Sequence, residues 1–302
     1  MALPLIDLVA DRPWGSCTDG AGKIQSVNTG NEEIENIEIR MLLEAVFQCY
    51  GFDFRQYAPA SLKRRIRNCV RNERVTSVSA LQEKLLYDEG AMQHFLQELS
   101  INVTALFRDA SFYRAFREHV LPRLRSYPFI RIWHAGCSSG EEVYSLAILL
   151  QEAGLYDRAR LYATDMNEVA LGHARDGVYP LEKMKIYAQN YLHAGGSGAL
   201  SDYYTAQYGR AIFNGSLKKN IVWSQHNLVT DGSFNEFHVI LCRNVLIYFD
   251  RALQARVHRL LYESLANFGM LGLGQKESIN FSEHEACYET LDDMEKWYRK
   301  IR

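Results

Sequence analysis

A turn with two glycines and two consecutive carboxylates lies between an apolar strand-like run and an apolar helical pattern. Gly136 and Gly140 are spaced G-x-x-x-G, which does not match the G-x-G-x-x-G pattern that sets a pyrophosphate at a helix N-terminus. Glu141 and Glu142 would repel a phosphate there, whereas the helix dipole favours their own charges. The turn therefore suits a ligand with a cationic end and no phosphate, unless the glutamates only cap the helix.

A further carboxylate, Asp165, ends the strand-like run ARLYATD. The carboxyl ends of parallel strands meet at the edge of the sheet where open α/β proteins bind ligands. Asp165 can accept hydrogen bonds there from both hydroxyls of a ribose. S-Adenosylmethionine combines a ribose with an ammonium and a sulfonium and carries no phosphate, so we expect it as the cofactor. The alternative is that Asp165 caps the helix that follows it.

Two other apolar runs also end in polar residues. The string LCRNVLIYFD places Arg243, Asn244 and Tyr248 directly beyond a buried strand, and the string HNL places Asn227 beyond another. Asn244 offers a donor and an acceptor, Tyr248 offers a phenol, and Asn227 can meet the edge of an adenine. We expect these side chains at the same sheet edge, although each string could also be an ordinary turn.

The string INVTALFRD lies just before the first strand and carries Asn102, Thr104 and Arg108. A guanidinium is a permanent cation whose geometry suits a two-point grip on a carboxylate. Arg108 is therefore a candidate for holding a substrate carboxylate, and a surface ion pair with Asp109 or Glu118 is the alternative.

The chain falls into three parts by pattern. Residues 1–36 are polar and aperiodic, which predicts a flexible leader. Residues 37–127 repeat apolar side chains at helical spacing, which predicts a small all-helical domain. From 128 to 302 strands alternate with helices, which predicts a parallel sheet. Residues 178–218 break that alternation and predict an insertion with two short antiparallel strands, YYTAQY and RAIFN.

The composition limits the class of protein and its partners. The 302 residues have a formal net charge of −2, which gives no overall attraction to nucleic acid or to an anionic membrane. No apolar run is long enough to cross a bilayer, and no secretory signal opens the chain. The six cysteines form no C-x-x-C pair, which favours reduced thiols and no metal site. We therefore expect a cytoplasmic protein that inserts into no membrane and binds no nucleic acid.

Several strings resemble, in their order along the chain, the motifs of the CheR family of chemoreceptor glutamate methyltransferases. They are INVTALFRD, AGCSSGEEVYSLA, ATDMNEVALGHARDGVYP, HNL, CRNVLIYFD and LGLGQKESI followed by WYRKI. FDFRQYAPASLKRRI also resembles the helical N-terminal domain of that family. The resemblance covers about residues 38–302 and departs from the family pattern at Leu106 and Val143, neither of which removes a chemical group.

The resemblance implies a class I S-adenosylmethionine-dependent methyltransferase, with a Rossmann-like α/β sheet, an all-helical N-terminal domain and a small antiparallel β insertion. It implies methyl transfer from S-adenosylmethionine to receptor glutamates, leaving S-adenosylhomocysteine. It also places Arg108 and Tyr248 beside the reacting carboxylate. The implied cofactor contacts are Asn102, Thr104, Arg108, Glu141, Asp165, Asn227, Leu228, Arg243 and Asn244.

One short segment of the chain is strongly basic and is a candidate for docking the substrate. Lys63, Arg64, Arg65 and Arg67 share one short predicted helix. Such a run is often no more than a solvated face, but the family resemblance favours docking to the acidic cytoplasmic helical domain of a methyl-accepting chemoreceptor. The insertion offers an edge strand on which a receptor C-terminal tail peptide can add by β-augmentation.

The expected reaction needs little machinery. A glutamate side chain is already ionised at neutral pH, with a reference pKa of about 4.3, so no general base is required. Catalysis then consists of desolvating and aligning the carboxylate, with Arg108 positioning it and Tyr248 aiming it. Two other classes compete with this reading. One is a cofactor-binding signalling adaptor without turnover, and the other is a nicotinamide oxidoreductase, which the missing third glycine disfavours.

Overall fold

The computed structural model describes residues 31–99, 104–280 and 282–302. Asn102 and most of the expected leader lie outside these ranges. The leader was expected to extend to residue 36, but the first helix begins at Asn31. Its first turn carries Glu32 and Glu33, whose charges favour a helix N-terminus although they add nothing to an apolar period.

Four helices form the N-terminal unit: α1 Asn31–Tyr50, α2 Pro59–Asn72, α3 Val78–Tyr87 and α4 Glu89–Leu99. Ser77 caps α3 by accepting a hydrogen bond from the backbone N–H of Ala80. The helices bury their apolar stripes against one another, and the core of the unit includes Leu42, Val46, Ile66, Leu81, Leu85 and Phe95. The unit therefore has a hydrophobic core of its own.

The rest of the chain is built on a seven-stranded sheet of order β6-β2-β1-β7-β8-β10-β9. The first five strands in that order pair in parallel, and β10 runs antiparallel to both neighbours. The strands are β1 Ile130–Ala135, β2 Ala159–Asp165, β6 Ile221–Gln225, β7 Phe237–Cys242, β8 Leu265–Leu273, β9 Tyr288–Asp292 and β10 Trp297–Lys300.

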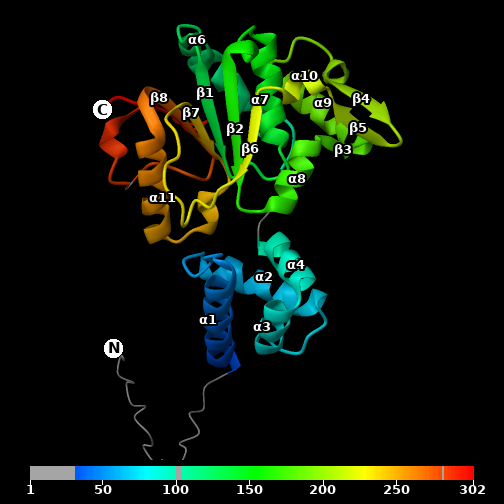
Figure 1. Cartoon of the computed structure of the whole chain (residues 1–302). Helices are drawn as coiled ribbons and strands as arrows, with labels where there is room; N and C mark the ends of the chain where they lie inside the picture. Colours follow the sequence, from blue (N-terminus) through cyan, green and yellow to red (C-terminus); the bar gives the residue numbers. More distant parts are fainter. Residues whose placement is uncertain (1–30, 100–103, 281) are drawn as a thin grey trace, which may run out of the picture.

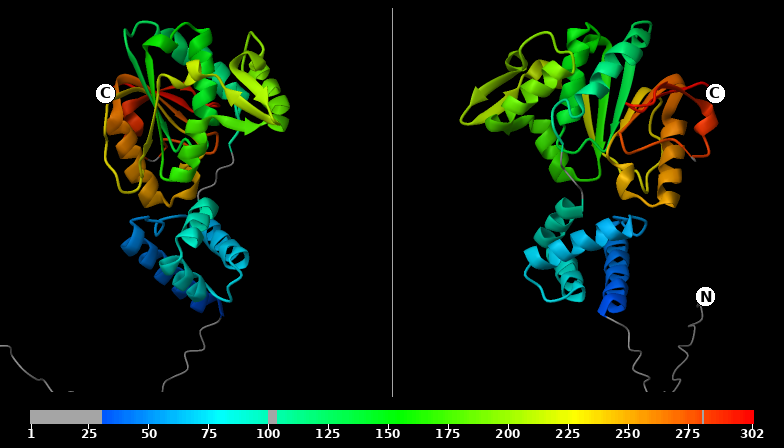
Figure 2. Two further views of the ribbon diagram at one scale, coloured as in Figure 1. Left: turned by 45° about the vertical axis from the view of Figure 1, so that its right-hand side comes forward. Right: turned by 180° about the vertical axis from the view of Figure 1, so that it is seen from behind.

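Helices cover both faces of this sheet, which is why most side chains of its central strands β1 and β7 are buried on either face (Figures 1 and 2). On β1, Ile130 and Ile132 join one core and Trp133 joins the other. The crossover helices are α7 Glu141–Glu152, α8 Glu168–Asp176 and α11 Arg251–Ser264. Short 3₁₀ turns lie at Tyr156–Arg158, Leu181–Lys183, Leu200–Tyr203, Leu246–Tyr248 and Glu285–Cys287.

The segment before β1 belongs to the sheet and not to the helical unit. It comprises α5 Ala110–Ala115, a π-helical turn Phe116–Val120 and α6 Leu121–Leu124. Its apolar side chains, such as Phe112, pack in the core under α7, whereas the core of the helical unit ends at Leu99. The boundary expected at residue 127 therefore differs from the packing, because a helical period does not reveal which core a helix joins.

The insertion is an antiparallel sheet of order β3-β5-β4, which confirms the expected β insertion. It contains β3 Val178–Pro180, β4 Tyr204–Gln207, β5 Arg210–Phe213 and the helices α9 Met184–His193 and α10 Gly215–Lys218. Tyr208 and Gly209 both have positive φ at the β4–β5 turn, as a two-residue hairpin of the primed type requires. The strand β3 was not expected, because three residues carry too little alternation to be recognised.

Within the described ranges, no helix is both long and apolar enough to span a bilayer. In the same part of the chain, no three His, Cys, Asp or Glu side chains are grouped so that they could hold a metal ion.

The buried His258 on α11 predicts a pH effect on stability. Burial disfavours the imidazolium and lowers the pKa of His258 from 6.5 to about 4. The unfolded chain takes up a proton at about pH 6.5, so stability should fall as the pH falls from there to about 4. The slope should reach about 1.4 kcal/mol per pH unit. Urea unfolding at several pH values measures it, and His258→Gln should flatten the slope whereas His173→Gln, at an exposed site, should not.

Candidate cofactor and substrate site

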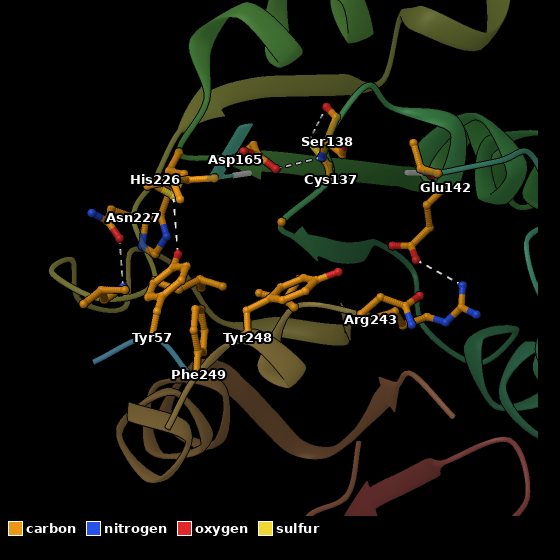
Figure 3. Close-up of a pocket in the computed structure, with 18 of the residues that line it drawn as sticks. Tyr57, Cys137, Ser138, Glu142, Asp165, His226, Asn227, Arg243, Tyr248 and Phe249 are labelled. Carbon is orange, nitrogen blue, oxygen red and sulfur yellow. Dashed lines mark hydrogen bonds and ion pairs between the residues drawn. The ribbon is translucent and has the colours of Figure 1, made fainter. Parts of the chain in front are cut away.

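A cavity of about 950 Å³, its open mouth included, lies at the carboxyl ends of the parallel strands (Figure 3). Its volume is in the range of small-molecule binding sites. The walls combine the sheet edge with residues of the helical unit, Tyr57 and Leu99. The sheet-edge and connecting residues are Thr104, Ala105, Arg108, Gly136, Cys137, Ser138, Glu142, Asp165, Met166, His226, Asn227, Leu228, Val229, Arg243, Asn244, Val245, Tyr248 and Phe249.

The two glutamates of the β1–α7 turn have different surroundings. Glu142 lines the cavity, where its carboxylate lies 2.9 Å from His134 Nδ1 and 3.3 Å from Arg243 Nη1. Burial alone would raise the pKa of Glu142, but the hydrogen bond and charge of His134 and the charge of Arg243 outweigh it and lower the pKa. Glu142 is therefore an anion at neutral pH, as a partner for a ligand ammonium must be.

Glu141, which was the expected cofactor contact, does not line the cavity. Its carboxylate accepts hydrogen bonds from Ser139 Oγ at 2.7 Å and from Tyr187 Oη at 3.4 Å, and burial raises its pKa. Consecutive helical residues point about 100° apart, so only one of the two glutamates can face the cavity. The structure places the second one there.

Asp165 ends β2 and is held by backbone groups. Its carboxylate accepts hydrogen bonds from the N–H groups of Ser138 at 2.8 Å and Asn167 at 2.9 Å. Burial raises its pKa, and these backbone donors oppose the rise. Asn227 and Leu228 follow the neighbouring strand β6, which ends at Gln225, and they line the same cavity. Because β2 and β6 are adjacent and Asp165 pairs with Gln225, these residues come to the same edge of the sheet.

Arg243 and Asn244 follow β7 and also line the cavity. The guanidinium of Arg243 is 2.8 Å from Asp109 Oδ2 and lies 3.9 Å over the ring of Phe112. Because it also contacts Glu142, it belongs to a buried network of opposite charges. In the structure it therefore links the carboxylates of Asp109 and Glu142.

The loop after β7 is anchored by Glu277, which the sequence analysis did not single out. Its two carboxylate oxygens accept hydrogen bonds from four backbone N–H groups, those of Asn244, Val245, Leu246 and Gly274, at 2.6–2.9 Å. Asn244 has a φ of 60°, a left-handed conformation that such bonds can hold. Glu277 is buried, and burial raises its pKa against the effect of the four donors.

Arg108, Thr104 and Tyr248 share the cavity with these residues. The Nε atom of Arg108 lies 4.0 Å from Asp109 Oδ2, a long separation for an ion pair between half-exposed groups. Burial raises the pKa of Tyr248, and the positive charges of Arg65 and Arg108 oppose the rise. The phenol and the Arg108 guanidinium therefore belong to residues that line one cavity. Asn102 lies outside the described residues.

The expected docking residues on α2 divide into two kinds. Lys63 and Arg67 pair with Glu35 of α1 at 3.0 and 2.6 Å, and Arg64 lines a groove between α1 and α2. Arg65 is buried: it donates to the backbone carbonyl of Leu99 at 2.9 Å and lies 5.1 Å over the ring of Tyr248. It therefore supports the side of the helical unit that faces the cavity, and its charge is not exposed to a partner.

Sequence reasoning missed several cavity residues: Tyr57, Cys137, Ser138, Met166, His226 and Phe249. Some lie next to residues that it chose, so the strand ends pointed at the right segments. Tyr57 lies more than one hundred positions before Asp165, and no local pattern connects the two. Only the folded chain brings them together.

The fold and the cavity define an α/β protein with a small-molecule site at the carboxyl edge of its sheet. The match to known families makes this specific. Residues 102–294 match the description "CheR methyltransferase, SAM binding domain", and residues 37–100 match "CheR methyltransferase, all-alpha domain". The chain therefore belongs to the CheR methyltransferase family, and it is an S-adenosylmethionine-dependent methyltransferase.

Curated relatives span most of the chain. The Cher3 protein of Pseudomonas putida is 46% identical over 270 residues, 89% of this chain and 99% of its own length. The chemotaxis protein methyltransferase of Listeria monocytogenes is 30% identical over 76% of this chain and 85% of its own. The Escherichia coli protein of the same name is 30% identical over 65% of this chain and 67% of its own.

Among solved structures, the glycopeptide N-methyltransferase MtfA complexed with sinefungin has a TM-score of 0.35 and 12% identity, over 57% of this chain and 50% of that one. That likeness is too distant to bear on function.

The residues present suit S-adenosylmethionine. Glu142 would supply an anion for its ammonium, and Asp165 would supply acceptors for the ribose hydroxyls. Glu142 would repel a pyrophosphate at the β1–α7 turn, as the sequence analysis expected of the two glutamates there. The cavity is therefore matched to a methyl donor and not to a dinucleotide.

Proposed function

We propose that the protein transfers the methyl group of S-adenosylmethionine to glutamate side chains of chemoreceptors, forming γ-methyl esters and S-adenosylhomocysteine. The names of the Listeria and Escherichia relatives support a role in chemotaxis. The observation that carries the proposal is that Arg108 and Tyr248 lie in the same cavity as Glu142 and Asp165. Arg108 and Tyr248, which can bind a carboxylate, thus share the cavity with Glu142 and Asp165, which fit the cofactor.

In this proposal the chain holds and aligns the two reactants. S-Adenosylmethionine, when bound, supplies a methyl group activated by its sulfonium. Glu142 grips the ammonium end, and Asp165 accepts hydrogen bonds from the ribose. Thr104, Asn227, Leu228, Arg243 and Asn244 line the remaining walls, with Asn102 proposed as a further contact. Since the substrate carboxylate is already ionised, no residue needs to remove a proton.

Arg108 and Tyr248 would have different roles toward the substrate carboxylate. A strong ion pair with Arg108 would stabilise the carboxylate before attack and so slow the reaction. We therefore infer that Arg108 brings the carboxylate into the cavity, while the Tyr248 hydroxyl sets its direction. The enclosing walls would exclude water from the attacking oxygen.

The helical domain of a receptor would dock on α2, and a receptor tail peptide could add to the exposed edge of β4. Since Arg65 is buried, Arg64 is the residue that tests the docking face. Reversing its charge in Arg64→Glu should lower kcat/KM for receptor methylation about tenfold at low salt, and the loss should shrink at high salt. S-Adenosylhomocysteine affinity should stay unchanged. Arg160→Glu, on the exposed start of β2, is the matched control, and equal losses in both variants would contradict the docking face.

The proposed reaction is tested with receptor-containing membranes and a methyl-labelled cofactor. Label should enter the receptor and should leave as methanol in alkali, because carboxyl methyl esters hydrolyse there. Label that resists alkali would point to methylation of nitrogen and would contradict a glutamate substrate. Tight binding of S-adenosylhomocysteine without any transfer would favour the adaptor alternative.

A further inference from the structure

The linker between α1 and α2 is hydrogen-bonded to the loop of the sheet domain that carries Tyr248. The backbone N–H of Ala58 donates to the carbonyl of Tyr248 at 2.8 Å, and the N–H of Asp250 donates to the carbonyl of Gln56 at 2.9 Å. Between these two bonds, Tyr57 and Phe249 form an antiparallel bridge. The position of Tyr57 is thus fixed by the same loop that carries Tyr248.

The ring of Tyr57 joins the two hydrophobic cores. Its centroid lies 5.1 Å from the rings of Phe54 in the helical unit and of Phe249 in the sheet domain, both in edge contact. Met166, which follows Asp165, packs in turn against the core of the helical unit. Tyr57 and Met166 therefore form the seam along which the helical unit closes over the cavity.

The hydroxyl of Tyr57 points along the cavity wall to Met166, beside His226 and Asn227 (Figure 3). Its hydrogen bond within the described ranges goes to the thioether sulfur of Met166 at 3.8 Å, and a thioether is a weak acceptor. Burial raises the pKa of Tyr57, and the negative charge of Asp165 adds to the rise. The phenol thus stays protonated and can still donate to a better acceptor.

The two ends of the cavity differ in chemistry. Asp165, Asn227 and Tyr57 lie at one end, and Glu142 with Arg243 lies at the other (Figure 3). Since Asp165 suits the ribose and Glu142 suits the ammonium, the nucleoside half of the cofactor belongs at the end where Tyr57 lies.

We propose that the hydroxyl of Tyr57 donates a hydrogen bond to the nucleoside half of the cofactor, so that the helical unit completes the cofactor site. The proposal requires that the cofactor fit the cavity as described, but not that the substrate be a glutamate. Its competitor is a purely structural role, in which Tyr57 only packs the seam.

Calorimetry with S-adenosylhomocysteine and with adenosine separates the two roles. Tyr57→Phe keeps the ring and removes the donor, so affinity for both ligands should fall by a similar factor of about three to ten. Glu142→Gln should weaken S-adenosylhomocysteine and leave adenosine unchanged. Tyr50→Phe, whose hydroxyl donates to the carbonyl of Leu85 within the helical unit at 2.8 Å, should bind both ligands like the wild type.

Each outcome decides the matter. If Tyr57→Phe binds both ligands like the wild type, or loses only S-adenosylhomocysteine, the nucleoside contact is refuted. A fall in the ligand-free unfolding midpoint with unchanged affinities would assign Tyr57 a packing role alone. Tyr57→Leu, which also removes the ring, should lose more affinity than Tyr57→Phe. Failure of the wild type to bind S-adenosylhomocysteine would instead overturn the assignment of the cavity itself.

Discussion

Replacing Glu277 with alanine is expected to lower the unfolding midpoint by about 10 °C and to abolish methyl transfer. The substitution leaves four buried backbone N–H groups without the carboxylate that accepts their hydrogen bonds. Loss of such a buried network costs about 3–5 kcal/mol, and in a domain of this size each kcal/mol shifts the midpoint by about 2–4 °C. Activity should vanish because Asn244 and Tyr248 lie in the loop that Glu277 holds.

Thermal unfolding followed by circular dichroism measures the effect. Glu283→Ala is the matched control, since Glu283 lies six residues further along the chain and makes an exposed ion pair with Arg259, so its midpoint should move by about 1–2 °C at most. Glu277→Gln keeps one oxygen that can accept from two of the four donors. Its unfolding midpoint should lie between those of Glu277→Ala and Glu283→Ala. A Glu277→Ala protein as stable as the wild type would show that the carboxylate does not carry the loop.

Replacing Tyr248 with phenylalanine is expected to lower the rate of methyl transfer about a hundredfold, with the affinity for S-adenosylhomocysteine within twofold of the wild type. The hydroxyl is proposed to direct the substrate carboxylate, and small errors in the alignment of reacting atoms have effects of this size. The ring, which packs under Arg65, remains in place. Single-turnover methylation and calorimetry measure the two quantities separately.

The comparison with Arg108→Lys sharpens this assignment. That change keeps the charge but loses the planar grip, so it should raise KM for the receptor more than it lowers kcat. If Tyr248→Phe instead loses cofactor affinity and rate by equal factors, the phenol belongs to the cofactor site and not to the substrate. A rate close to the wild type would remove Tyr248 from the proposed mechanism.

The parallel sheet and its functional edge could be predicted because their signals are local. Short apolar runs such as FIRIWHA that alternate with helical patterns favour buried parallel strands, and polar residues that follow such strands lie at the carboxyl edge of the sheet. The predicted residues Asp165, Asn227, Arg243 and Tyr248 are therefore brought to one cavity. The charged turn also predicted a ligand that has a cationic end and carries no phosphate, which agrees with the family of the chain.

What could not be predicted depends on contacts between distant segments. The sequence does not distinguish two adjacent glutamates. Which of them faces the cavity depends on how α7 is oriented about its axis, and in the structure it is Glu142 and not Glu141. Arg65 looks like its basic neighbours, but the packing of α2 against α4 buries it. Tyr57 and Glu277 act through partners far away in the chain. Their roles follow from the fold and not from spacing.

The last strand in the chain, β10, supports the candidate cofactor site through intermediate residues. The indole of Trp297 stacks on Phe112 with a centroid separation of 4.5 Å and donates a hydrogen bond to the Phe112 carbonyl at 3.2 Å. Phe112 in turn supports the guanidinium of Arg243, which fixes Glu142. On the ribosome, residue 297 is made long after all three. In a nascent polypeptide, the contacts that hold Glu142 in place therefore remain incomplete until β10 has emerged from the exit tunnel. Cofactor binding should come late in biosynthesis for this reason.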